Sequence, residues 1–485
     1  MPSQRPDLSL LRGTRRHLAP LVCALAAALS GCTTLAPQNT ELPETPVPAA
    51  WSTQVSSPYA LVTPATASLA EWWQRFNDPQ LTALITLALQ ANTDVRSAQA
   101  ALQQARALRD VRSASLLPAV GTSASARRSQ SGSNDPGNSF QAGFDASWEP
   151  DVFGGNRSAV NATTADAQAA EASLANIQVS IAAEVAVTYI ELRGLQARLA
   201  IAQRNLAAQQ ETLQLSRWRA QAGLVSSLDV EQAVAASEQT SAQIPLLQTG
   251  AAQAMSSLAV LSGQAPGALQ VTLAMPAAVP QAPADLALAL PASTLRQRPD
   301  VRAAERRISA ALARVAQADA ARYPGFQLGG SLGLNALTLG TLASGASVVR
   351  SLLASVSVPL FDGGAARAQV RAQEAALEQT RVAYQGTVLT ALKDVEDALV
   401  SLQGNRERLA RLQAAAEAAG NADLLAGQRY ASGLIDFRAV LETQRTLLST
   451  QDSVEATRAS LSADHVRLYK ALGGGWTSAA ETATP

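Results

Sequence analysis

Two stretches of the chain, RAQAGLV at residues 219–225 and RYASGLI at residues 429–435, share an arginine followed four residues later by Gly-Leu and an aliphatic residue. Each follows a long segment without proline and precedes a segment in which small or apolar residues recur every seven positions. A glycine at the end of a helical pattern is typical of a helix stop. Each stretch therefore predicts the turn of a long helical hairpin, and their offset of 210 residues indicates that the hairpin occurs twice.

Motifs on both sides of these turns recur in the same order, which indicates a duplication of nearly the whole chain. The recurring pairs are Asn92-Thr93-Asp94-Val95-Arg96 with Arg298-Pro299-Asp300-Val301-Arg302 and Leu117-Pro118 with Tyr323-Pro324, both at an offset of 206, and Phe153-Gly154-Gly155 with Phe361-Asp362-Gly363-Gly364. We assign residues 72–265 to a first repeat, 266–291 to a Pro/Ala-rich linker, 292–475 to a second repeat and 476–485 to a C-terminal tail.

Long helices are predicted for the proline-free segments from Gly155 to about Gln221 and from Gly364 to Ser432. In the first segment, small or apolar residues alternate in steps of four and three from Ile181 onward, which is a heptad pattern. About 65 residues at ~1.5 Å each give ~100 Å of helix, so such helices must pack along their sides. We interpret these stripes as core packing that builds architecture and carries no chemistry.

Alternation of apolar and polar residues predicts two strands in each repeat. The pattern is clear in residues 140–149 and 326–335, continues in 348–360 with Arg350 interrupting it, and is weaker in 120–128. Four strands leave two open edges, which are a hazard in water and forbidden in lipid. Three chains would supply twelve strands, which is within the range of outer-membrane barrels.

The N-terminus has the layout of a secretory signal, in which arginines precede an apolar run from Leu18 to Leu29 that is too short to span a bilayer. The run ends in Leu29-Ser30-Gly31-Cys32, which resembles a bacterial lipobox. We therefore predict a signal peptide at residues 1–31, a lipidated Cys32 and an extended leader at 32–71. The alternative is an ordinary signal with a chance cysteine, but Cys32 would then be an unpaired thiol in an exported protein.

The composition excludes several classes of protein. Lys and Arg number 38, as do Asp and Glu, so the chain offers no electrostatic footprint for nucleic acid. The two cysteines and two histidines are too few for a zinc or disulfide scaffold or a histidine cluster. No Ser/His/Asp or Cys/His arrangement has catalytic spacing, and His465 is expected at the surface. We predict no enzymatic activity, no metal site and no cofactor besides the N-terminal lipid.

Together these residues resemble the outer membrane efflux proteins, in the lipoprotein branch of the outer-membrane factors of tripartite drug efflux. The resemblance covers nearly the whole mature chain, and it rests on the order of Trp72-Trp73, Phe76, Asp78-Pro79, Leu81, Asn92, Trp148-Glu149, Phe153-Gly154, Arg298-Pro299-Asp300, Glu305, Tyr323-Pro324, Phe361, Gly363-Gly364 and both Gly-Leu turns. It implies a mainly helical homotrimer whose twelve-stranded β-barrel in the cell outer membrane continues into a long periplasmic α-barrel. It also implies passive export of drugs or other small molecules, with a periplasmic adaptor (membrane fusion) protein and an inner-membrane efflux pump as partners.

The resemblance assigns roles to residues at the hairpin turns. It implies that the adaptor docks on Gly223-Leu224 and Gly433-Leu434, and that a polar link between Asp229 and Tyr430 helps to hold a gate closed. The alternative for both side chains is a solvated hairpin tip with no gate.

The match is incomplete at the constriction that the family lines with acidic side chains. Ala439 stands where one aspartate is common, whereas Glu442, one helical turn further on, fits a second acidic position and is assigned to the gate. Three Glu442 carboxylates near a threefold axis would repel anions, although Arg438 could weaken that field. An exposed heptad flank is the alternative for Glu442.

Two other functions remain open from the sequence. One is a structural periplasmic coiled-coil lipoprotein that braces the envelope without a pore, which would require the alternating segments to be soluble. The other is an efflux adaptor, which would show a lipoyl-like β domain flanking one hairpin, whereas this chain shows two hairpins with membrane-type strands.

Overall fold

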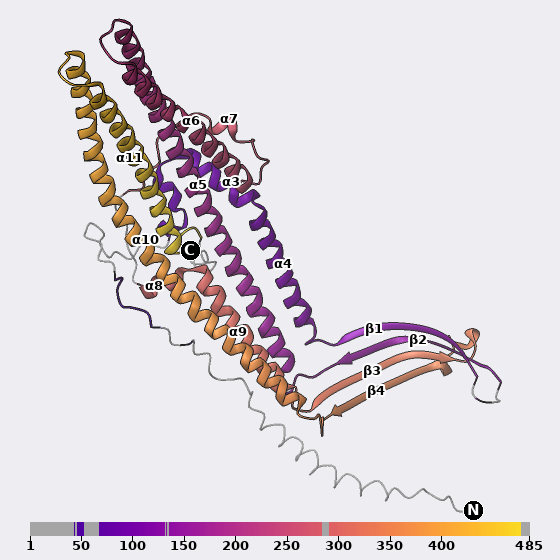
Figure 1. The fold of residues 1–485 in the computed structure, drawn as a ribbon. Helices are drawn as coiled ribbons and strands as arrows, with labels where there is room; N and C mark the ends of the chain where they lie inside the picture. The colour runs from indigo at the N-terminus through magenta and orange to yellow at the C-terminus, as the bar shows by residue number, and fades with distance from the viewer. Residues whose placement is uncertain are drawn as a thin grey trace, which may run out of the picture. The chain divides into compact units, whose positions relative to one another are not determined.

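A computed structural model describes residues 43, 46–52, 67–130, 132, 135–283 and 291–476, and the predicted signal peptide and Cys32 lie outside these residues. The elements follow one another along the chain as drawn in Figure 1. They are α2 (Ala67–Ala70), the 3₁₀ helix η2 (Trp72–Phe76), α3 (Pro79–Ala91), α4 (Thr93–Ala114), β1 (Ala119–Ser129), β2 (Gly137–Trp148), α5 (Gly155–Gln221), α6 (Ser227–Leu261), α7 (Gln270–Leu273), α8 (Pro291–Gln297), α9 (Pro299–Ala320), β3 (Gly325–Ala336), η3 (Leu339–Thr341), η4 (Gly345–Ser347), β4 (Val348–Ser357), α10 (Ala365–Ala431) and α11 (Phe437–Ala471).

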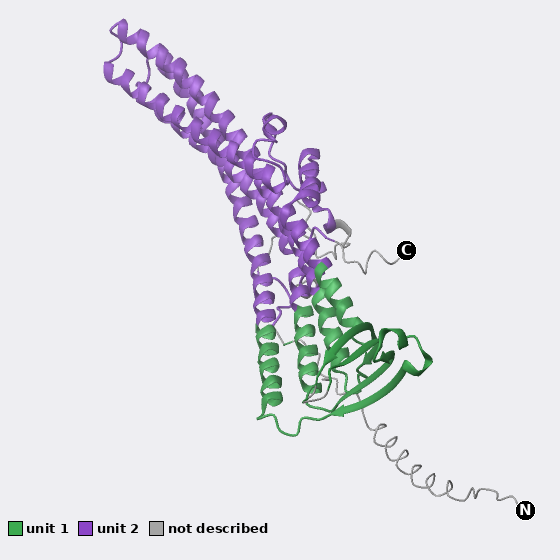
Figure 2. Cartoon of the chain, turned by 90° about the vertical axis from the view of Figure 1, so that its right-hand side faces the viewer, with its two compact units in different colours: residues 1–43, 104–168, 305–382 green, residues 44–103, 169–304, 383–485 purple. Residues whose placement is uncertain are grey.

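The predicted long helices and strands are confirmed. The two proline-free segments form α5 and α10, and the four alternating segments form β1 to β4, including the weak first strand. The chain divides into two compact units that each draw on both repeats (Figure 2). Unit 1 consists of residues 1–43, 104–168 and 305–382, and unit 2 consists of residues 44–103, 169–304 and 383–485.

Unit 1 contains an antiparallel sheet with the strand order β1-β2-β3-β4, in which β2 and β3 join the two repeats. The register places alternate residues of all four strands on one face, as the period of two requires. In one row across the sheet, Thr122 pairs with Phe144, Phe144 with Leu332, and Leu332 with Arg350. Arg350 therefore interrupts an otherwise largely apolar face, as the sequence predicted.

The other face of the sheet is largely polar. The hydroxyl of Ser123 donates to the carboxylate of Asp145 at 3.0 Å, and the hydroxyls of Ser331 and Ser351 lie 2.6 Å apart. The apolar face is uncovered in the protomer, where Phe144 is 61% and Leu352 88% exposed. The outer strands of the sheet are β1 and β4, so the protomer has two strand edges available for pairing.

Corresponding helices of the two repeats have equal lengths: 22 residues in α4 and α9, 67 in α5 and α10, and 35 in α6 and α11. The offset between the repeats is nevertheless 206 residues at the start of β3 and 210 at the start of α10. The strand-to-strand connections account for this change, because residues 337–347 outnumber residues 130–136 by four. The duplication has kept its helices and lengthened one loop.

The core of unit 2 is built around an aromatic stack at the start of the first repeat. The ring of Trp72 stacks on that of Tyr469 with centroids 5.5 Å apart, and both side chains are fully buried. Asp78 caps α3 by accepting hydrogen bonds from the backbone of Gln80 and Leu81, and the hydroxyl of Tyr189 donates to its second oxygen at 2.9 Å. This core packs the middle of α5 against α11.

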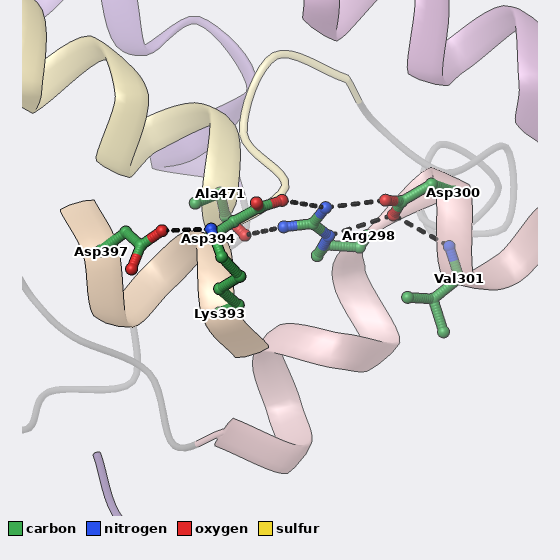
Figure 3. Close-up of polar contacts among 7 residues, drawn as sticks. All are labelled: Arg298, Asp300, Val301, Lys393, Asp394, Asp397 and Ala471. Carbon is green, nitrogen blue, oxygen red and sulfur yellow. Dashed lines mark hydrogen bonds and ion pairs between the residues drawn. The ribbon is translucent and has the colours of Figure 1, made fainter. Parts of the chain in front are cut away.

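Arg298 ties three helices of unit 2 together (Figure 3). Its guanidinium donates to Asp300 at the start of α9, to Asp394 on α10 at 3.0 Å, and to the carbonyl oxygen of Ala471 at the end of α11, also at 3.0 Å. Burial by itself lowers the pKa of Arg298, but the two carboxylates outweigh burial and raise it, so the guanidinium stays charged.

The expectation that His465 lies at the surface is wrong. All residues from Leu461 to Val466 are buried, because this stretch of α11 is surrounded by other elements of unit 2. His465 is 5% exposed, and its Nδ1 lies 2.8 Å from the carbonyl oxygen of Leu461. Its neighbour Asp464 is buried as well and accepts hydrogen bonds from Asn405 and Arg467.

Candidate functional site

The two hairpin turns of unit 2 have the same backbone structure. Gly223 has φ +72° and Gly433 has φ +74°, and the amide of the following leucine donates to the carbonyl oxygen five residues earlier, at 2.8 Å in the first turn and 2.9 Å in the second. This is the Schellman helix end that glycine favours. A Cβ at either glycine would meet nothing within 4 Å, so the requirement for glycine comes from the backbone conformation alone.

Leu224 and Leu434 project from these turns and are each 73% exposed. They form a matched pair of apolar side chains at the ends of the two hairpins, next to glycines that leave the backbone open. This arrangement is suited to contact with a partner protein. The adaptor-docking role of the two Gly-Leu pairs stays a prediction.

The next helix of each hairpin begins with a different cap. In the first hairpin, Ser226 and Asp229 form a capping box: the Ser226 hydroxyl accepts from the Asp229 amide, and the Asp229 carboxylate accepts from the amide of Ser226 at 3.1 Å and from its hydroxyl at 2.8 Å. In the second hairpin, Asp436 alone caps α11 by accepting from the amide of Ala439 at 3.1 Å. Asp229 is therefore engaged at the start of its own helix.

Tyr430 lies in a small apolar cluster that joins the two hairpins near their turns. The cluster contains buried residues of α5, α6, α10 and α11: Leu213, Ala233, Ala426, Tyr430, Phe437 and Val440. The Tyr430 ring packs on Phe437 with centroids 5.3 Å apart, and the guanidinium carbon of Arg219 lies 4.4 Å from its centroid. Tyr430 is 7% exposed, and its buried hydroxyl finds no hydrogen-bond partner among the described residues.

The predicted hydrogen bond between Asp229 and Tyr430 is thus not made within this protomer. Both residues lie near the hairpin turns, as expected, and their gate role remains a prediction. Sequence reasoning missed the partner that Tyr430 does have, Arg219. A signal was available, because Arg219 is the first residue of the repeated stretch that defines the turn.

Glu442 is exposed on α11, with 69% of its side chain accessible, and its carboxylate lies 3.4 Å from the guanidinium of Arg445. An exposed pair of this kind is weak and screened by salt. Glu442 is therefore free to reorient toward a neighbouring subunit or an ion. No group of three or more His, Cys, Asp or Glu suited to a metal ion occurs among the residues that the structure describes.

Known proteins share both the sequence and the fold of this chain. The family model described as outer membrane efflux protein matches residues 84–264 and 290–474, one match in each repeat. The toluene efflux pump outer membrane protein TtgF of Pseudomonas putida is 31% identical over 94% of this chain and 96% of its own length. The pyoverdine export outer membrane protein OpmQ of Pseudomonas putida is 33% identical over 96% of this chain and 99% of its own length.

Solved structures agree with these relatives. The outer-membrane channel OprN is 35% identical and superimposes with a TM-score of 0.83 over 90% of this chain and 100% of its own. The MtrE outer-membrane channel of Neisseria gonorrhoeae, solved in its open state, is 27% identical and has a TM-score of 0.80 over 92% of this chain and 99% of its own.

These findings account for the membrane-type sheet and the long paired helices. They assign the chain to the outer membrane as a channel component of a tripartite efflux system, which extends into the periplasm and works with an adaptor and an inner-membrane pump, without a cofactor or enzymatic activity. The two matched repeats, the relatives over nearly the full length and the shared fold lead to one conclusion: the chain belongs to the outer membrane efflux protein family.

Proposed function

We propose that three copies of this chain close into a twelve-stranded barrel whose helices continue as a periplasmic tunnel, and that the tunnel conducts substrates passively. The observation that carries the proposal is the sheet of unit 1, which has one largely apolar face and two available edges, β1 and β4. Pairing of β4 in one protomer with β1 in the next removes every edge and turns the apolar face toward lipid.

A matched pair of substitutions tests the membrane role of the sheet. Leu352 pairs with Gly330 on the apolar face, whereas the adjacent Leu353 pairs with Gly329 on the opposite face. An aspartate facing the hydrocarbon costs on the order of 2 kcal/mol in each subunit. Leu352→Asp should therefore sharply reduce the amount of SDS-resistant trimer in outer-membrane fractions, and Leu353→Asp should be tolerated. Equal loss in both variants, or a water-soluble wild-type protein, would refute the barrel and favour the brace.

The hairpin turns are proposed to form the periplasmic entrance. Leu224 and Leu434 dock the adaptor, and Asp229, Tyr430 and Glu442 belong to the gate beneath it. The double substitution of Leu224 and Leu434 by Ser should abolish ethidium efflux from cells that carry the cognate adaptor and pump, while bilayer conductance persists. Leu246→Ser is the matched control, because Leu246 is equally exposed, at 73%, but lies in the middle of α6.

The cargo is proposed to be set by the partner pump. The names of the relatives record toluene efflux in one case and pyoverdine export in another. Two such different cargoes fit a conduit that accepts what its pump delivers.

Lipidation at Cys32 is proposed as the membrane anchor of the leader, and Cys32→Ser should abolish incorporation of labelled palmitate.

A further inference from the structure

Four side chains at intervals of seven residues along α5 reach across to the second hairpin. They are Arg198, Asn205, Thr212 and Arg219. Because seven residues complete nearly two helical turns, all four lie on one face of α5. Each of the four stands next to an apolar position of the heptad pattern through which α5 packs. They therefore form a polar stripe along the edge of the core.

The first three rungs of this stripe are hydrogen bonds to α11. Arg198 makes a two-pronged ion pair with Asp452, at 2.7 and 3.1 Å. The amide of Asn205 donates to the side chain of Gln451 at 3.1 Å. Further toward the turn, the amide of Gln444 donates to the Thr212 hydroxyl at 3.1 Å. Gln444 and Gln451 are themselves seven residues apart, so the second and third rungs run in register, whereas Asp452, the partner of Arg198, directly follows Gln451.

The fourth rung differs in chemistry from the other three. Arg219 contacts α10 instead of α11, and it does so through the face of the Tyr430 ring, with the guanidinium carbon 4.4 Å from the centroid. The ring also contacts Phe437, which lies seven residues before Gln444 and so continues the register of the α11 stripe. Near the turns the hairpins are therefore joined by a cation–π contact in place of a hydrogen bond.

No hydrogen bond of the Tyr430 side chain backs up its ring contacts among the described residues. Its hydroxyl is without a partner among the described residues, and the carboxylate of Asp229 is occupied by the capping box of α6. The Tyr430 ring is thus held by Arg219 and by the apolar cluster that contains Phe437.

We propose that Arg219 is a positioning residue of the gate, which latches the second hairpin to the first by stacking on Tyr430, with the Arg198–Asp452 pair as the fixed end of the same seam. This inference rests on the proposed channel function and names the contact that regulates it. Opening breaks the contact between Arg219 and Tyr430 first, because this contact lies near the turns of the hairpins and no hydrogen bond reinforces it. The hydroxyl and amide rungs can exchange partners as the helices slide, since neighbouring polar groups of the same stripe lie along both helices.

The test separates the ring face of Tyr430 from its hydroxyl. The full-length lipidated trimer is reconstituted in planar bilayers, and the open-to-closed ratio is measured for Arg219→Gln, Tyr430→Leu and Tyr430→Phe. Loss of the stack should raise the ratio by about fivefold, the size expected for one partly shielded cation–π contact. Tyr430→Phe keeps the ring and should raise the ratio far less than Tyr430→Leu. The double variant Arg219→Gln with Tyr430→Leu should add little to either single change.

Arg217→Gln is the matched control, because Arg217 is exposed on the same turn of α5 and removes an equal charge. If Arg217→Gln opens the channel as much as Arg219→Gln, general loss of positive charge is the cause and the latch is refuted. If Tyr430→Phe opens the channel as fully as Tyr430→Leu, the hydroxyl carries the closed state, and a bond to a carboxylate such as Asp229 replaces the proposed stack.

A second readout does not depend on conduction. Loosening of the turn should speed tryptic cleavage after Arg429 and Arg438 in the folded detergent-solubilised trimer, by about fivefold in Arg219→Gln and not in Arg217→Gln. A wild-type trimer that never conducts would refute the proposed channel function, while the cleavage rates would still decide the latch. Unchanged cleavage in Arg219→Gln would overturn it.

Discussion

Asn92 and Arg298 occupy equivalent positions in the two repeats, and each donates a hydrogen bond to the last carbonyl of a returning helix. The Asn92 amide reaches Leu261 at the end of α6 at 2.9 Å, and the Arg298 guanidinium reaches Ala471 at the end of α11 at 3.0 Å. Asn92 also accepts from the amides of Asp94 and Val95, so it caps α4. Both repeats therefore keep a hydrogen bond from this position to the end of the returning helix, although the side chain that donates it differs.

Replacement of Arg298 by alanine is expected to destabilise unit 2 by about 2–4 kcal/mol, because it leaves a buried carbonyl unsatisfied and two carboxylates without their cation. Thermal unfolding followed by circular dichroism measures the change. Lys393→Ala is the control: Lys393 directly precedes Asp394 but pairs with Asp397 in solvent (Figure 3), and its removal should leave the melting temperature unchanged. Equal melting temperatures of the two variants would contradict the stabilising role of the Arg298 contacts.

Two glycines with the same backbone conformation should respond differently to alanine. Gly223 and Gly263 have φ +72° and +71°, but a Cβ at Gly223 meets nothing, whereas one at Gly263 would lie 2.5 Å from the carbonyl oxygen of Ala91. Gly223→Ala should cost roughly 1–2 kcal/mol for the left-handed conformation alone. Gly263→Ala should cost roughly 1–3 kcal/mol more through overpacking. The yield and melting temperature of the trimer measure the effect of each substitution. A smaller loss of stability in Gly263→Ala than in Gly223→Ala would show that the backbone around Ala91 shifts to make room.

His465 should make stability sensitive to mild acid. Burial, followed by the nearby charge of Arg406, lowers its pKa, and neither the carbonyl of Leu461 nor Asp464 compensates. Below pH about 6.5 the imidazole of His465 binds a proton in the unfolded chain but stays neutral in the folded chain. The free energy of unfolding therefore falls as the pH drops from about 7 toward the pKa of the folded state. His465→Asn, which can keep a donor near Leu461, should flatten the melting temperature over this range.

The Arg198–Asp452 pair should tolerate exchange of its charges. Arg198→Asp places two carboxylates together and should destabilise the seam by about 1 kcal/mol, since both side chains are about one-third exposed. Adding Asp452→Arg restores an ion pair of reversed polarity and should recover most of the loss. If the double variant has a melting temperature as low as that of Arg198→Asp, then packing of the aliphatic part of Arg198, and not its charge, holds the helices together.

Much of the fold could be predicted because its signals are local. The Gly-Leu turns end their helices through the backbone of a few residues, and alternation along β3 needs no knowledge of its neighbours. The capping role of Asp229, which we did not predict, also has a local signal, because Ser226 stands three residues earlier.

The remaining features depend on contacts between distant segments. The burial of His465 follows from elements that surround α11 on all sides, which a heptad pattern cannot reveal. The contact of Arg219 with Tyr430 joins residues 211 positions apart. The repeated stretch marks both as turn residues, but it does not indicate that they touch each other. Long-range side-chain partners at the turns therefore had to come from the structure.

The unequal strand connections set against equal helices show where this architecture accepts insertions. Four extra residues within a helix would rotate everything beyond them by about 40° and misalign every later rung. The same four residues in the connection from β3 to β4 leave the ladders intact. That connection joins the ends of β3 and β4 that lie away from α9 and α10. The equal helices keep the contacts between the two hairpins aligned, whereas the connection from β3 to β4 takes added residues without disturbing those contacts.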